Sequence, residues 1–158
     1  MKNTILITWN ELQQQIDLRN FYMGESAKRK EPDADTIQSS KDDEELLIIF
    51  ARQACNELVT AVALRFPSIS VTVDNKYISL EFETISTCRN DLLLMLKQAI
   101  ADYISNEVTM QWLLVRQPQM ANTNISLKNS LYNNVQQMFA KFYDSTRTRR
   151  RATDLAGI

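Results

Sequence analysis

One uninterrupted helical segment, from Arg89 to Arg116, constrains this chain more than any other feature. It contains no glycine or proline, and Pro118 follows just beyond its end. Its apolar residues recur at spacings of mostly three, four and one: Leu92, Leu93, Leu96, Ala99, Ile100, Tyr103, Ile104, Val108, Met110, Leu113 and Leu114. This spacing forms a wide apolar stripe on an α-helix, which other elements must cover. We therefore expect the helix to be the spine of a small helical domain, with polar residues such as Asn106 and Glu107 facing solvent.

A shorter helix is predicted near the start of the chain. Thr8 and Glu11 have the spacing of a capping box, in which the threonine hydroxyl and the glutamate carboxylate each accept a hydrogen bond from the other residue's backbone amide. Ile7 and Leu12 occupy the positions of the hydrophobic staple that accompanies such a box. We expect this helix to end near Gly24.

Two further helices flank the spine along the chain. The second begins with acidic residues at Asp42–Glu45, which favour a helix N-terminus, and Pro67 ends it. Its apolar residues, Ile49 among them, widen its stripe, so we expect it to be buried on more than one side. The last helix follows Asn122-Thr123-Asn124, and its short connection to the spine predicts an antiparallel neighbour.

Alternating apolar and polar residues over 68–84 predict a β-hairpin between the second helix and the spine. Asp74 and Asn75 suit a two-residue turn, because both residues tolerate positive φ. That register places Val71 opposite Ile78 on an apolar face, which must pack on the helices or pair with another subunit. The predicted fold is therefore mainly α with minor β, a bundle of about four helices with one inserted hairpin.

Two segments lack a pattern of buried residues. Residues 25–41 combine mixed charges, Pro32 and several Ser and Asp residues, which predicts a long mobile loop. Residues 146–158 have no apolar periodicity and carry four clustered arginines: Arg147, Arg149, Arg150 and Arg151. We therefore expect a helical domain over residues 1–145 and a basic C-terminal tail over 146–158.

Residue counts argue against an enzyme. The chain has no histidine, which removes Ser-His-Asp, Cys-His and histidine–metal sites, and its two glycines do not allow a glycine-rich phosphate loop. We expect no catalysis, no metal and no cofactor. The two cysteines do not make a disulfide framework, and Cys55 is expected to be a small core residue. No apolar run reaches transmembrane length, and the N-terminus does not resemble a signal peptide, so we expect synthesis in the cytoplasm.

The residues that suggest binding are few. The arginine cluster fits contact with phosphate groups, with an acidic protein surface, or with solvent alone. Met110 and Trp112 belong to an apolar cluster near the end of the spine, which suits either core packing or a subunit interface. On the outward face of the hairpin, three residues are interface candidates: Tyr77, Glu81 and Glu83.

Several stretches resemble the head–tail connector (adaptor) proteins of tailed bacteriophages, most closely those of phages that infect Bacteroidetes, including crAss-like phages. The resemblance is carried by ITWNEL (Ile7–Leu12), DDEELLIIFARQACNEL (Asp42–Leu58), YISLEF (Tyr77–Phe82), IADYISNEVTMQWL (Ile100–Leu113) and LYNNVQQMFAKFYDSTRTRRR (Leu131–Arg151). It implies a virion protein at the head–tail junction. Such a protein forms a ring, often of twelve copies, between the portal protein and tail proteins, around a channel for DNA. An alternative from the arginine cluster is a helical nucleic-acid-binding factor that acts in packaging or regulation.

Overall fold

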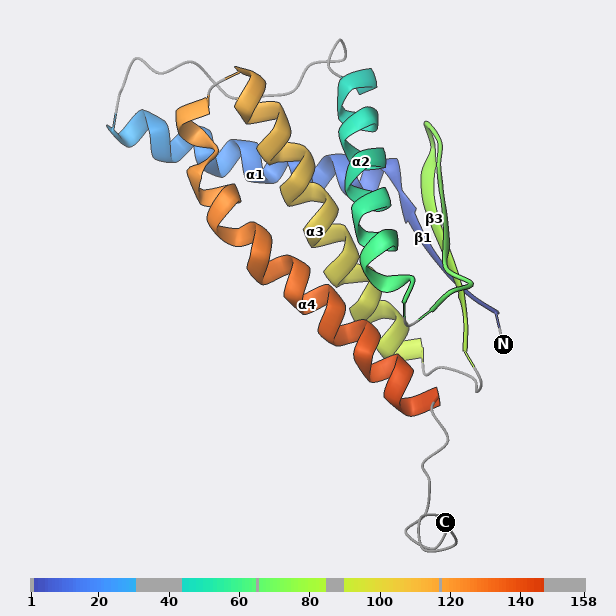
Figure 1. Cartoon of the computed structure of the whole chain (residues 1–158). Coiled ribbons are helices and arrows are strands. Elements are labelled where there is room, and N and C mark those ends of the chain that lie inside the picture. The colour runs from blue at the N-terminus through green and yellow to red at the C-terminus, as the bar shows by residue number, and fades with distance from the viewer. Residues whose placement is uncertain (1, 31–43, 65, 85–89, 117, 147–158) are drawn as a thin grey trace, which may run out of the picture.

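The structure is a computed structural model that describes residues 2–30, 44–64, 66–84, 90–116 and 118–146. In this part of the chain, four α-helices and three β-strands are joined in the order shown in Figure 1. Their bounds are β1 (Lys2–Thr8), α1 (Trp9–Lys30), α2 (Glu44–Val62), β2 (Ser70–Val73), β3 (Tyr77–Glu83), α3 (Asn90–Arg116), the short 3-10 helix η2 (Pro118–Met120) and α4 (Asn122–Thr146). The prediction of a mainly α fold with a hairpin between the second and third helices is confirmed.

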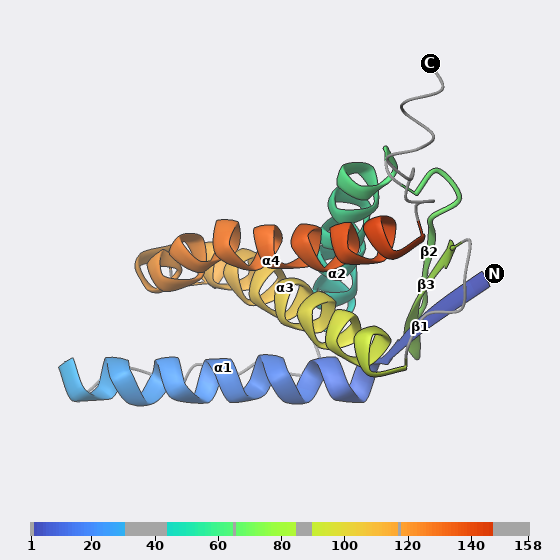
Figure 2. The same ribbon diagram turned by 90° about the horizontal axis from the view of Figure 1, so that it is seen from below.

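Helix α3 is the spine of the domain, as expected. Figure 2 shows α1 and α4 on opposite sides of it, and α2 also packs against it. Because α3 is covered from several directions, its middle turns are buried on their polar side as well. Asn106 and Glu107 are therefore buried, and the expectation that they face solvent is wrong. The largest fully buried side chains come from every layer: Tyr103, Phe82, Phe139, Ile7, Leu12, Ile16, Leu47, Leu58, Ile78, Leu80 and Leu96.

The sheet has a third strand that the sequence patterns did not predict. Strand β1 pairs antiparallel with β3, so the strand order is β1-β3-β2. Its side chains alternate between exposed and buried, and Ile5 and Ile7 enter the core. The sheet thereby packs its apolar face on the helices, as an isolated hairpin must do to be stable.

The hairpin register differs from the predicted one. Val71 lies opposite Leu80 rather than Ile78. The cause is a turn displaced by one residue: the Asp74 amide donates to the carbonyl oxygen of Tyr77 at 3.1 Å, and the Asp74 carboxylate accepts hydrogen bonds from the backbone amides of Lys76 and Tyr77 at 2.6 and 3.0 Å. The slip is an even number of residues, so every side chain keeps its predicted face.

Helices α1 and α2 depart from their expected bounds. Helix α1 runs past Gly24 to Lys30, so residues 25–30 of the predicted loop are helical, and 31–41 lie outside the described residues. Helix α2 ends at Val62, before Phe66. Ile49 is exposed, because the buried side of α2 is narrower than predicted.

Aromatic packing joins the far end of the bundle to the sheet. The rings of Phe66, Phe82 and Phe139 lie with centroids 5.6 to 5.8 Å apart, in edge-to-face and tilted arrangements. They come from the residues after α2, from β3 and from α4. Such pairs stabilise a core beyond their buried area alone, and they fix how the sheet meets α4.

Candidate interaction surfaces

The two interface candidates at the end of α3 lie inside the single chain. Met110 and Trp112 are only 5% and 4% exposed. This placement agrees with core packing, the other reading of their cluster. The exposed apolar side chains at this end of α3 are Leu114 and Val115, at 40% and 63%. Contact with a neighbouring molecule here would involve those two residues.

The hairpin candidates lie on the outer face of the sheet, as predicted. Tyr77 and Glu83 are exposed. Glu81 forms an ion pair with Lys2 of β1 at 2.8 Å, within the same chain. The pair raises the pKa of Lys2, mainly through its hydrogen bond to Glu81. The negative charge of Glu81 is thus already paired with Lys2 within the chain. The predicted tail contacts, Arg147, Arg149, Arg150 and Arg151, lie outside the described residues.

A first continuous surface is formed where β1, α1 and the start of α3 meet. Leu6, Leu18 and Leu94 are 46%, 54% and 66% exposed there. Two hollows of the surface share Leu94 and Lys97: one lies between α1 and α3, and the other between β1 and α3. We call this region, centred on these three leucines and Lys97, the Leu94 surface.

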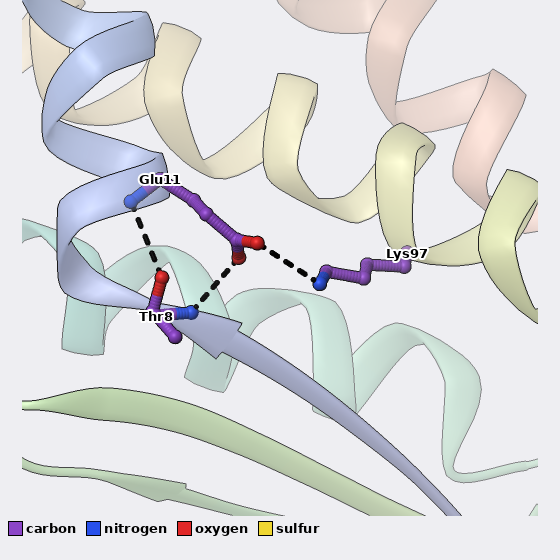
Figure 3. A network of polar contacts seen from close by, with 3 residues as sticks. All are labelled: Thr8, Glu11 and Lys97. Carbon is purple, nitrogen blue, oxygen red and sulfur yellow. Dashed lines mark hydrogen bonds and ion pairs between the residues drawn. The ribbon is translucent and has the colours of Figure 1, made fainter.

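An ion pair stands in the Leu94 surface. Lys97 of α3 lies 3.3 Å from the carboxylate of Glu11, which also closes the predicted capping box (Figure 3). The Glu11 amide donates to the Thr8 hydroxyl at 3.3 Å, and the Thr8 amide donates back to Glu11 at 3.1 Å. The Thr8 amide lowers the pKa of Glu11, and Lys97 adds to this effect. The pair thus ties α1 to α3 at the edge of the surface.

The outer edge of β1 borders the same surface. The amide of Trp9 donates to the carbonyl oxygen of Lys76 at 2.9 Å. Because bonding alternates along an antiparallel pair, the backbone groups of Thr4 and Leu6 point away from β3. On the opposite edge of the sheet, the Arg52 side chain donates to the carbonyl oxygen of Val73 at 3.5 Å. The outer edge of β1 thus lies beside the start of α3, at the hollow lined by Thr4, Leu6 and Leu94.

The sequence did contain a signal for the Leu94 surface. Residues 92–96 read LLLML, five apolar residues in a row. One stripe of a helix cannot bury five consecutive side chains, so some of them must face outward. Leu94 and Met95 are the ones that do. The edge of β1 had no comparable signal, because its apolar run is very short.

A second surface is a groove between α2 and α4, with α3 at its floor. It is lined by Asn56, Glu57, Thr60, Ala61, Tyr103, Lys128, Asn129 and Tyr132, and we call it the Glu57 groove. The Tyr103 hydroxyl donates to Glu57 at 3.3 Å. The rings of Tyr103 and Tyr132 lie 5.8 Å apart. The groove thus combines the partly exposed ring of Tyr132 with a carboxylate.

A buried carboxylate is paired with the lysine of the groove. Lys128 lies 3.3 Å from Glu107 and 3.8 Å from Glu57. The Glu107 side chain is 4% exposed, and burial raises its pKa, with Lys128 opposing the shift. One Glu107 oxygen has no hydrogen-bond partner among the described residues. Burial and the two nearby carboxylates also raise the pKa of Tyr103. Lys128 thus stands between two negative charges.

Within the described ranges, no cluster of three or more His, Cys, Asp or Glu side chains is arranged to hold a metal ion. None of the helices in that part of the chain is both long and apolar enough to cross a bilayer.

No protein-family model matches the chain, and no curated protein or solved structure is significantly similar to it.

Proposed function

We propose that this chain is a subunit of the head–tail connector of a tailed bacteriophage. The subunits form a ring beneath the portal, join capsid to tail and surround the DNA channel. The sequence resemblance over Ile7–Leu12, Asp42–Leu58 and the later stretches supports this proposal. The order of elements agrees with it, since a capped first helix, an acid-started second helix, a hairpin and two antiparallel helices follow in turn.

The observation that carries the proposal is the distribution of exposed apolar side chains along α3. Leu94 and Met95 are exposed near its start, and Leu114 and Val115 near its end. A helix of this length spans about 40 Å at roughly 1.5 Å per residue, so the two groups belong to separate surfaces. Rings are built from heterologous contacts, in which one face of a subunit meets a different face of the next. A chain with two separate apolar surfaces suits that arrangement.

The proposed partners follow from this role. Neighbouring copies, twelve in the ring that we propose, meet through the Leu94 surface and the far end of α3. The portal protein binds on one side of the ring and tail proteins bind on the other. DNA passes through the channel without sequence-specific contacts, and the role requires no membrane. It is structural and requires no reaction, so the chain needs no catalytic residues.

Reconstitution with the portal protein tests the proposal. The purified chain, mixed with portal, should form a closed ring visible by electron microscopy and a larger complex by size exclusion. Leu94→Asp places a charge on the Leu94 surface and should abolish the ring. Gln137→Asp, at an exposed position of α4, is the matched control and should leave it intact. Absence of any complex with portal would refute the connector role.

The second candidate function is a nucleic-acid-binding factor, and the arginine cluster of the tail is the observation that favours it. It predicts binding of duplex DNA by the isolated chain that weakens steeply with salt. Changing the four arginines to alanine should abolish this binding. Strong DNA binding without any portal complex would favour this function over the connector.

A further inference from the structure

The Glu57 groove has an unbalanced charge. Lys128 is its only cation among the described lining residues, and it serves both Glu57 and Glu107. The lysine lies closer to Glu107, and because Glu107 is buried, its charge would cost more free energy unpaired than that of Glu57. Glu57 is left with the longer 3.8 Å contact and one hydrogen bond from Tyr103. Counted formally, the three charged groups sum to −1.

The geometry of the groove suits a planar cation. Glu57 is 57% exposed and presents a carboxylate to anything that enters. A guanidinium can bond such a carboxylate through two parallel N–H groups and can stack on aromatic faces. Tyr132 lines the same groove, is partly exposed and supplies such a face, and the buried Tyr103 ring packs behind it. A lysine ammonium could form an ion pair with Glu57, but it could neither donate two parallel hydrogen bonds nor stack on an aromatic ring.

The chain itself carries the complementary group, in the arginines of residues 147–151. We propose that arginines of this tail bind in the Glu57 groove of a second copy of the chain. Glu57 pairs with the guanidinium, and Tyr132 contacts its face. This contact joins two copies of the chain and does not require the portal, so it stands apart from the connector role.

Chain length favours a neighbour's tail over the chain's own. Between Lys128 and Thr146, helix α4 rises about 27 Å, at roughly 1.5 Å per residue. An extended chain covers at most about 3.6 Å per residue, so the Arg151 backbone lies within about 18 Å of Thr146. A tail that turned straight back along α4 at full extension would leave the Arg151 backbone about 9 Å short of Lys128, so its guanidinium would reach the groove only if the reversal of the chain cost no length. The tail of a neighbouring copy can approach the groove from outside, so the length of α4 does not limit its reach.

A peptide-binding measurement tests the proposal. The receptor is the full-length chain with its four tail arginines changed to alanine, which leaves its own tail unable to compete. The probe is a fluorescent synthetic peptide of residues 144–158, followed by anisotropy at fixed salt. We expect saturable binding to this receptor. Glu57→Gln in the receptor should weaken the binding about tenfold or more, as expected for loss of a charged hydrogen-bond partner.

Two controls separate the groove from general attraction. Glu45→Gln removes one charge from an exposed position of the same helix and should leave the affinity unchanged. A peptide with its four arginines replaced by lysine keeps the charge and should bind several-fold more weakly, because it lacks the planar fork. Circular dichroism melting of the Glu57→Gln variant shows whether its fold is intact.

Three results would overturn the proposal. In the first, Glu57→Gln binds the peptide as tightly as the unchanged receptor. In the second, Glu45→Gln weakens binding as much as Glu57→Gln, so that only overall charge matters. In the third, the peptide binds duplex DNA or the portal protein but not the receptor. A failed portal reconstitution, by contrast, would leave the expected peptide binding untouched.

Discussion

Asn106 and Asn124 hold α3 and α4 together through a reciprocal pair of hydrogen bonds. The Asn124 side-chain amide donates to the side-chain oxygen of Asn106 at 3.0 Å, and the Asn106 amide donates to the backbone carbonyl of Asn124 at 3.1 Å. Both residues are buried. A buried polar pair is stable only when its partners meet in one geometry. The pair therefore fixes where the start of α4 packs along α3.

Asn106→Ala should destabilise the domain more than its size suggests. It removes two hydrogen bonds and leaves the Asn124 side-chain amide buried without its acceptor, a loss of about 2 kcal/mol in the free energy of unfolding. Urea unfolding followed by circular dichroism measures it. Asn133→Ala, at an exposed position of α4, should change the free energy by less than about 0.5 kcal/mol. Equal effects of the two changes would contradict the role of the pair.

The sequence predicted the elements whose signals are local. The long apolar period over 89–116 predicted α3 to within one residue at its start, and the Thr8–Glu11 spacing predicted the capping box that the structure contains. The faces of β3 followed from alternation alone. In each case the pattern lies within one short stretch of sequence, so neighbours in space did not have to be known.

The features that the sequence did not predict depend on packing between distant segments. Strand β1 does not alternate cleanly in sequence, because the polar Asn3 is buried and the apolar Leu6 is exposed, and it forms because β3 offers it a partner. Asn106 and Glu107 look like residues of a solvated face until α4 covers them with Asn124 and Lys128. The Glu57 groove gathers residues from three helices. No spacing within one helix could have predicted it.

Thr8→Ala should weaken the start of α1. It removes the hydroxyl that accepts from the Glu11 amide, and such a cap contributes about 1 kcal/mol. Thermal unfolding should shift by a few degrees for a chain of this size. Thr72→Ala, at an exposed position of β2, removes a threonine hydroxyl without touching a cap and serves as the control. An unchanged midpoint in Thr8→Ala would contradict the cap.

Glu11→Gln should make stability less dependent on pH in the acid range. The folded-state pKa of Glu11 is lowered, so its ionised form stabilises the fold above the unfolded pKa near 4.5. That contribution is lost as the pH falls through the lower folded pKa. Urea unfolding of both proteins between pH 3 and 6 should therefore show their difference shrinking toward pH 3. A constant difference across the range would show that the carboxylate charge is not involved.

Cys55 should resist thiol reagents in the folded chain. Burial raises the pKa of its thiol to about 12, so the reactive thiolate is scarce at pH 8. Its side chain is also closed off from solvent by the core. In a Cys88→Ser background, labelling by a thiol reagent should be slow until urea unfolds the protein. Rapid labelling in the absence of urea would contradict the packing of α2.

Lys128→Met should destabilise the domain, and more at high pH than at low pH. The substitution leaves the buried Glu107 carboxylate without its cation. Because Lys128 is itself about a third exposed, the free energy of unfolding should fall by about 2 kcal/mol near neutral pH, less than for a fully buried pair. Burial already raises the folded-state pKa of Glu107, and losing Lys128 raises it further. A carboxyl whose folded pKa lies above its unfolded value stabilises the protonated fold, and that stability is lost as the pH rises through the folded pKa.

Urea unfolding of Lys128→Met at pH 4.5 and pH 8 tests this sign. The destabilisation relative to the unchanged chain should be small at pH 4.5 and large at pH 8. The double variant with Glu107→Gln should recover most of the lost stability and lose this pH dependence, because the buried charge is gone. If the double variant were as unstable as Lys128→Met, the lysine would act through packing of its stem, and Glu107 would not be the group that requires it.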